Sequence, residues 1–322
     1  MNTQQAVQQL RDDVALFARP EGRMVGTAGH KQARRDLVAR LTALGLRPYA
    51  GDGFELPYEV EGTAYCNILG RLPGLDASLP PVVLVAHYDT VIRYAGADDN
   101  AAAMAILLAS VEPLRSRKLA RDVVFAFFDA EEPPHFLTPR MGSIHFYNHQ
   151  RRGPVHCAVV LDLVGHDVQI PGFEDLLFIT GMESDAGLAE VIQDTKARGL
   201  KPLPTLNAYV GDLSDHHVFR INQRPYLFLT CAHSPDYHRP TDTPDKLNYE
   251  KMAAIRNYLL GLTERIAQLS LEGPFEGYDS APVEIAFMKR NMGPILAMFG
   301  LSAQSREDIE RIAKLFVSQF QL

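Results

Sequence analysis

Five side chains that can bind a metal ion stand in this chain, each just past an apolar run or in a turn: His87, Asp99, Glu132, Asp162 and His238. Buried strands are predicted for four nearby apolar runs, over residues 81–86, 122–128, 157–161 and 226–230. Because an open α/β sheet gathers its functional groups at the carboxyl ends of its strands, these side chains should meet at one edge. Three carboxylates and two imidazoles brought together suit divalent zinc, and a pair of metal ions better than one.

Each of these positions carries little information by itself. Residues 96–100 (GADDN) have the composition of an ordinary turn and helix cap, and a pair such as Glu131-Glu132 usually belongs to a solvated face. Here, however, the two glutamates follow an apolar strand and precede Pro133-Pro134, where two like charges are costly unless something compensates them. The signal is therefore the ordered occurrence of all five positions.

Strands and helices must alternate along the chain to bring these positions together. Apolar residues at helical spacing predict one helix near the N-terminus, a second over residues 30–44, and a third over residues 100–114 with Asn100 as its N-cap. A strand is predicted near residues 64–72, and the alternation continues to about residue 270. This pattern is typical of a doubly wound α/β fold, a mostly parallel mixed sheet with helices on both faces, as one domain over residues 1–270.

Residues 271–322 form a separate segment in this interpretation. A linker or surface loop is predicted up to residue 284, and two helices are predicted after it, over residues 285–299 and 305–321. Ser305 with Asp308 gives the last helix a start similar to a capping box. We expect this C-terminal helical extension to make a dimer, to shape a lid or to pack on the domain.

Composition excludes several classes of function. The chain has 322 residues, 46% of them hydrophobic, and a formal net charge of −7, so a globular protein is expected and a nucleic-acid partner is not. No apolar stretch approaches the ~18 residues of a membrane span, and the N-terminus does not resemble a signal peptide. The cysteines, Cys66, Cys157 and Cys231, are widely separated in strand-like runs, which is typical of buried thiols in a reducing compartment. We therefore expect a cytoplasmic protein.

Six motifs carry a resemblance to a known family: HYDT from residue 87, GADDNA from 96, DAEEPP from 129, LDLVG from 161, SDHHVF from 214 and DYHRPTDTPDKL from 236. In this order, and over roughly residues 20–265, they resemble the zinc aminopeptidase family numbered twenty-eight among the metallopeptidases (clan MH). That family also contains the glutaminyl cyclases. The resemblance implies a doubly wound sheet with a two-zinc site on its carboxyl edge.

The family pattern implies a role for each matched residue. His87 and Asp162 are expected to bind one zinc ion, and Glu132 and His238 the other. Asp99, the second aspartate of its pair, is expected to bridge the two ions. The resemblance therefore implies two zinc ions per chain as cofactor.

Further roles are expected around these ligands. Asp89 would accept a hydrogen bond from the neighbouring imidazole and fix its tautomer. Glu131 matches the family's general base, and Tyr237 would donate a hydrogen bond to the developing oxyanion. For Asp215 and His216 a supporting position and a direct contact with substrate stay open. Seven other histidines are expected on the surface or in the core: His135, His145, His149, His156, His166, His217 and His233.

The leading hypothesis is a metal-dependent exopeptidase that removes N-terminal residues from peptides, with a free-N-terminus peptide as its partner. A first alternative is a glutaminyl cyclase, which binds one zinc ion and cyclises an N-terminal glutamine. It is kept because residues 131–143 are longer than a tight turn, should lie over the pocket, and are elongated in the cyclases also. A second alternative is a non-catalytic scaffold that binds peptide amines and forms a homo-oligomer through its C-terminal helices. The complete set of ligands and base weakens that alternative.

Overall fold

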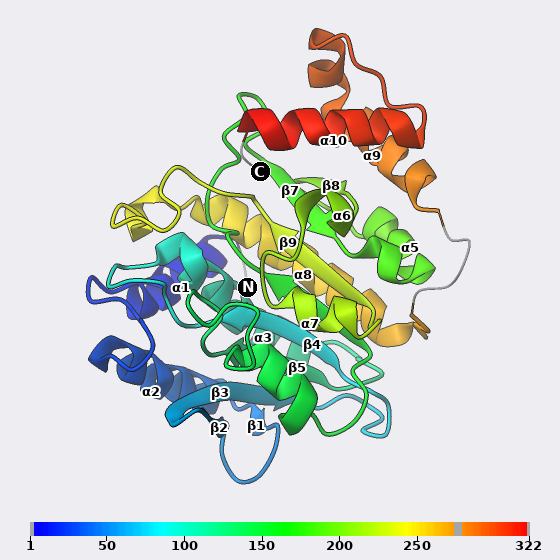
Figure 1. Ribbon diagram of the computed structural model, residues 1–322. Helices are drawn as coiled ribbons and strands as arrows, with labels where there is room; N and C mark the ends of the chain where they lie inside the picture. Colours follow the sequence, from blue (N-terminus) through cyan, green and yellow to red (C-terminus); the bar gives the residue numbers. More distant parts are fainter. Residues whose placement is uncertain (1–2, 274–278, 321–322) are drawn as a thin grey trace.

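A single mixed sheet forms the centre of the computed structural model, which describes residues 3–273 and 279–320 (Figure 1). Its strand order is β1-β3-β5-β4-β6-β9-β7-β8, and β2 pairs with β3 outside this path. The strands are β1 (Arg47–Pro48), β2 (Glu55–Val60), β3 (Thr63–Leu72), β4 (Val82–His87), β5 (Val123–Phe128), β6 (Cys157–Leu161), β7 (Leu176–Thr180), β8 (Lys201–Pro204) and β9 (Tyr226–Thr230).

The four central strands β5, β4, β6 and β9 run parallel. On one side β1, β2 and β3 pair antiparallel, and on the other β7 runs antiparallel to β9 and parallel to β8. Antiparallel pairing of β2 with β3 follows from a two-residue turn, Glu61-Gly62, in which both residues have positive φ. The predicted mixed α/β sheet is confirmed, and its parallel pairing is concentrated in the centre.

Helices cover both faces of the sheet, as predicted. Side chains of strand β4 alternate between the two faces of the sheet: Leu84 packs into the core on one face, and Val83 and Val85 pack into the core on the opposite face. The face of Leu84 is covered by α1 (Thr3–Phe17), α2 (Ala28–Ala43), α3 (Ala102–Arg115), α5 (Ala186–Asp194) and α8 (Tyr249–Gln268). The opposite face carries α4 (Gly142–His145), the π-helix η2 (Phe146–Gln150) and α7 (His216–Ile221).

Asn100 is not the N-cap of α3, contrary to our expectation. It lies inside the irregular π-helical turn η1 (Ala97–Ala101), and α3 begins only at Ala102. Its side-chain Nδ2 donates to the carbonyl of Leu161, 3.0 Å away. The amide therefore ties η1 to the end of β6, because a carbonyl from a distant segment competes with the helix start for this side chain.

The C-terminal helices are present and lie at the β7–β8 end of the sheet (Figure 1). Helix α9 (Ala281–Met298) starts within the predicted linker because Pro282 occupies a first-turn position that favours helix. Helix α10 (Arg306–Phe320) starts as the capping-box pattern predicts, with Asp308 N donating to Ser305 Oγ at 3.3 Å. Among the helices of the described chain, none is long and apolar enough to cross a membrane.

Candidate metal centre and its cavity

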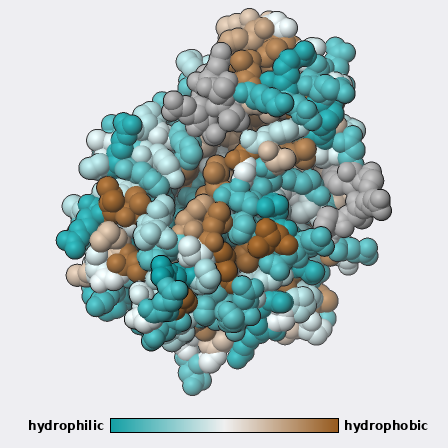
Figure 2. Space-filling model, in the orientation of Figure 1, coloured by the Kyte–Doolittle hydropathy of each residue, from teal (hydrophilic) through white to brown (hydrophobic). Residues whose placement is uncertain are grey.

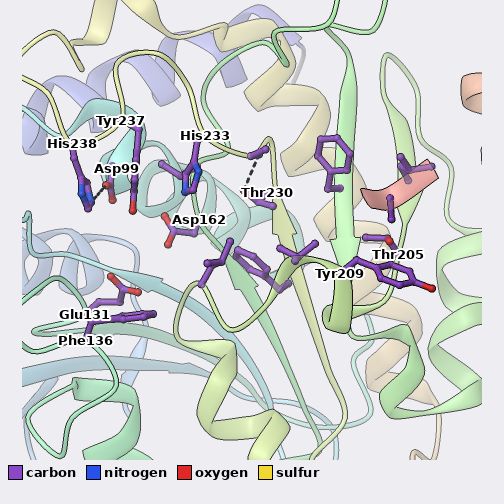
Figure 3. A pocket seen from close by; sticks show the side chains of 18 of the residues that line it. Asp99, Glu131, Phe136, Asp162, Thr205, Tyr209, Thr230, His233, Tyr237 and His238 are labelled. Atoms are coloured by element: carbon purple, nitrogen blue, oxygen red, sulfur yellow. Dashed lines mark hydrogen bonds and ion pairs between the residues drawn. The ribbon is translucent and has the colours of Figure 1, made fainter. Parts of the chain in front are cut away.

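The five predicted ligands meet at the carboxyl edge of the parallel strands. His87 is the last residue of β4, Glu132 follows β5, and Asp162 follows β6 directly. His238 lies in the loop after β9, and Asp99 projects from η1. Figure 3 shows His238, Asp99, Asp162 and Glu131 at one end of a cavity.

Asp99 presents one carboxylate oxygen to each imidazole. Its Oδ1 lies 3.2 Å from His87 Nε2, and its Oδ2 lies 3.3 Å from His238 Nε2. His87 Nε2 is also 3.5 Å from Asp162 Oδ1, and His238 Nε2 is 3.1 Å from Glu132 Oε2. Ligand atoms about 2.0–2.1 Å from a tetrahedral zinc ion lie about 3.4 Å from one another. The observed distances therefore match donor atoms that share an ion.

Several of these donor atoms are buried without a hydrogen-bond partner: His87 Nε2, Asp99 Oδ2, Glu132 Oε1, Asp162 Oδ1 and His238 Nε2. Buried polar atoms in native proteins are normally paired, so each needs an explanation. Imidazole nitrogens and carboxylate oxygens are the donors that zinc binds. The residues present therefore fit a metal centre.

The pKa values of several buried side chains at this edge are shifted far from their usual ranges. Burial, with Asp99 nearby, raises the pKa of Glu132 to about 8, and burial raises the pKa of Glu131 well above its usual range. Burial opposes protonation of His238, but its contacts with Asp99 and Glu132 raise its pKa to about 10. Four buried carboxyl groups thus face two imidazoles, and divalent cations at this edge would favour the ionised form of all four.

The backbone around η1 separates Asp99 from Asp98. The Asp98 carboxylate accepts from Gly165 N at 2.7 Å and contacts His166 Nδ1 at 2.6 Å, away from the other ligands. Asp242 accepts from the backbone N–H of both Asp98 and Asp99, at 2.8 and 3.1 Å. Of the two aspartates, only Asp99 is consequently directed at the imidazoles of His87 and His238.

Asp89 has more contacts than the sequence indicated. It faces His87 Nδ1 at 3.5 Å, the side on which we expected it to fix the imidazole. It also accepts from the backbone N–H of Glu131 and of Glu132, each at 3.1 Å. Ala130, with φ of 56°, supplies the kink after β5 that lets the two glutamates leave the strand. Asp89 therefore holds the loop that carries both glutamates.

Glu131 and Tyr237 lie beside the ligands. Glu131 Oε2 is 3.8 Å from His87 Nε2, and its carboxylate forms one close group with His87 and Asp162. The Tyr237 ring stacks on His238 with centroids 3.8 Å apart, and burial raises the pKa of its hydroxyl. Both side chains line the cavity (Figure 3).

Asp215 and His216 are fully buried, and neither is among the described residues that line the cavity. The His216 ring stacks on Phe228, which does line the cavity, with centroids 4.3 Å apart. His216 Nε2 also contacts the carbonyl of Gly211 at 3.3 Å. The position of both residues favours the supporting alternative over direct contact with substrate.

The cavity wall includes residues that the sequence did not single out. His233, expected on the surface or in the core, stacks on Tyr237 with centroids 4.3 Å apart and lines the cavity. The expected cover from residues 131–143 is contributed by Pro133 and Phe136. Beyond the metal end the wall consists mainly of apolar side chains from β7, β8 and the C-terminal helices: Phe178, Leu203, Met288, Met292 and Ile312. Of these residues the sequence indicated only Ile312, as part of the apolar face of the last helix, and it did not indicate a shared cavity.

Two bacterial proteins are similar to this chain in sequence. The uncharacterized protein YfbL of Escherichia coli is 29% identical over 228 residues, covering 61% of this chain and 69% of its own length. Aminopeptidase YwaD of Bacillus subtilis is 25% identical over 196 residues, covering 58% of this chain, and the match spans only 41% of YwaD.

Solved structures share the fold. The glutaminyl cyclase of Fimbriiglobus ruber superposes with a TM-score of 0.65 at 20% identity, over 81% of this chain and 95% of that one. A Zn-dependent exopeptidase from Parabacteroides distasonis gives 0.64 at 19% identity, over 82% and 98%. The model of peptidase family M28 matches residues 67–263, more than half of the sequence. This chain therefore belongs to peptidase family M28.

Proposed function

We propose that this protein is a two-zinc aminopeptidase that cleaves N-terminal residues from peptides. The observation that carries the proposal is the position of Asp99, which offers one oxygen to each of two imidazoles that have further carboxylate neighbours. His87 and Asp162 would hold one ion with Asp99, and Glu132 and His238 the other. Such a shared carboxylate suits a pair of ions better than one.

The chain's own residues would then handle the substrate's protons and charge. When bound, zinc supplies acidification of water and polarisation of a carbonyl. Glu131, at the edge of the ligand group, takes the proton from the attacking water and delivers it to the leaving amine. Tyr237, in the opposite wall, donates its hydroxyl to the oxygen that gains negative charge.

Glutaminyl cyclase activity is a second candidate function. It is supported by the superposition on the Fimbriiglobus ruber enzyme, which is as good as that on the exopeptidase. A cyclase joins the substrate's own α-amino nitrogen to its side-chain amide carbonyl and releases ammonia, so it needs no hydrolytic water. The number of zinc ions and the products formed therefore distinguish the two activities.

The test measures zinc content and turnover together. About two zinc ions per chain, with chelator-sensitive hydrolysis of aminoacyl amides, supports the peptidase. One zinc ion with release of pyroglutamyl product from a glutaminyl peptide supports the cyclase. If the protein binds no zinc and shows neither activity, both candidate functions are contradicted.

A variant at the base sharpens this test. Glu131→Gln should retain the metal yet lower kcat by on the order of 10² to 10⁴. Glu59→Gln, the same change at an exposed glutamate of β2, is the matched control and should keep normal turnover. Full activity of Glu131→Gln would remove Glu131 from its role.

A further inference from the structure

The cavity extends well beyond the metal centre and ends against the C-terminal helices. In Figure 3 His238 and Glu131 lie at one end, and Thr205 and Tyr209 lie at the other. Met288 and Met292 of α9 line it together with Ile312 of α10. In the view of Figure 2, apolar residues form a group in the middle of the surface, with smaller groups at the left and near the top. The two helices outside the family match thus form a wall of the cavity.

This far end, which we call the distal chamber, is lined by Phe178, Leu203, Met288, Met292 and Ile312, with Thr205 and Tyr209 as its polar groups. Among its described lining residues none is charged, whereas the metal end carries four carboxylates. A charged group entering this chamber would lose its water without gaining a counter-ion, and an apolar group would gain by leaving water.

An ion-pair cluster holds α9 and α10 in position. Arg306, the first residue of α10, contacts Glu284 of α9 at 2.7 Å and Asp279 at 2.7 Å. The Glu284 side chain is completely buried. Arg306 Nη1 also donates to the hydroxyl of Tyr209, a chamber residue, at 3.4 Å. The wall is therefore tied to the chamber by specific polar contacts.

We propose that α9 and α10 determine specificity, because the distal chamber receives a large apolar side chain of the substrate's N-terminal residue. Met292 and Met288 set the size that is accepted, and the unbranched methionine side chains adapt to leucyl, methionyl or phenylalanyl groups. The proposal rests on the aminopeptidase function above. A substrate with its scissile bond beside Glu131 would place its first side chain along the cavity, towards α9.

The kinetic test compares leucyl and alanyl amides. Met292→Trp, which fills the chamber, should lower the leucyl-to-alanyl ratio of kcat/KM by roughly tenfold to a hundredfold, the effect of even one methylene group in an apolar pocket. Met292→Ala should also lower it, because the shorter side chain no longer reaches the leucyl group. Met298→Ala, in the same helix but 74% exposed, is the matched control and should keep the wild-type ratio. An unchanged ratio in both Met292 variants would overturn the proposal.

A binding test separates this inference from the proposed function. The chain contains no tryptophan, so Phe178→Trp places a single tryptophan, which can be excited selectively, in the chamber wall. Isoamylamine, the amine with the leucine side chain, should shift its emission, and ethylamine should not. If amides are hydrolysed but emission does not respond, the chamber assignment is wrong and the peptidase stands. If emission responds but no amide is hydrolysed, the peptidase is wrong and the chamber stands.

Discussion

Replacing Asp89 by asparagine should weaken metal binding without removing any ligand. Asp89 is fully buried, and its two oxygens serve His87 and the backbone N–H groups of Glu131 and Glu132. Asparagine has nearly the same shape, but one of its oxygens becomes an NH₂ group. One backbone N–H would then face a donor in place of an acceptor.

The size of this effect follows from the hydrogen bond and the charge that the substitution removes. A hydrogen bond to a charged group contributes about 1.5–3 kcal/mol, and Asp89→Asn breaks one such bond at 3.1 Å and removes the charge opposite His87. If the lost free energy is the one that keeps the metal ligands in position, zinc affinity falls by about tenfold to a hundredfold. Removing a partner that orients a metal ligand has a typical effect of this size.

The assay is competition for zinc against a chromogenic chelator, with Asp52→Asn as the control. Asp52 is exposed, so the same chemical change there should leave affinity unaltered. Thermal unfolding of both variants without metal separates weaker affinity from impaired folding. Wild-type zinc affinity in a folded Asp89→Asn variant would refute the idea that Asp89 orients the ligand loop.

Three further perturbations have defined outcomes. Chelation should lower Tm by several degrees and added zinc should restore it, because a ligand bound only by the folded state stabilises it; an unchanged Tm would contradict a metal centre. Arg306→Ala should lower Tm because it leaves buried Glu284 without a counter-ion, an effect of about 3 kcal/mol or less since Arg306 is partly exposed and Ser280 still donates to Glu284; adding Glu284→Gln should recover part of that stability. Burial lowers the pKa of His156 to about 4. Because an unfolded histidine titrates near ~6.5, its contribution to stability is present above that pH and lost as pH falls towards 4. His156→Gln, which can still contact the carbonyl of Ile266, should flatten this part of the pH–stability curve, and an identical curve would exclude His156.

The positions of the central strands were predictable because the signal is local. Residues 157–161 and 226–230 are short, mainly apolar runs, and they coincide with β6 and β9. The positions of the edge strands were harder to predict from the sequence. β8 is short and contains Pro202 and Pro204, so its sequence does not stand out as a strand, and its partner β7 supplies the missing context. Asn100 shows the same limit, since its side chain donates to a carbonyl at the end of β6, about sixty residues later in the chain.

The sequence by itself determined which residues could reach the metal edge. Strand ends are set by local apolar patterns, and the carboxyl ends of parallel strands must share an edge, so His87, Glu132 and Asp162 follow from chain order. Tertiary structure decided what local patterns cannot encode. Asp98 and Asp99 are adjacent and chemically identical, and only contacts with distant segments direct one of them at the imidazoles. Likewise, apolar residues in α9 show that a face is buried, but that face lines a cavity built with β7 and β8, which lie far earlier in the chain.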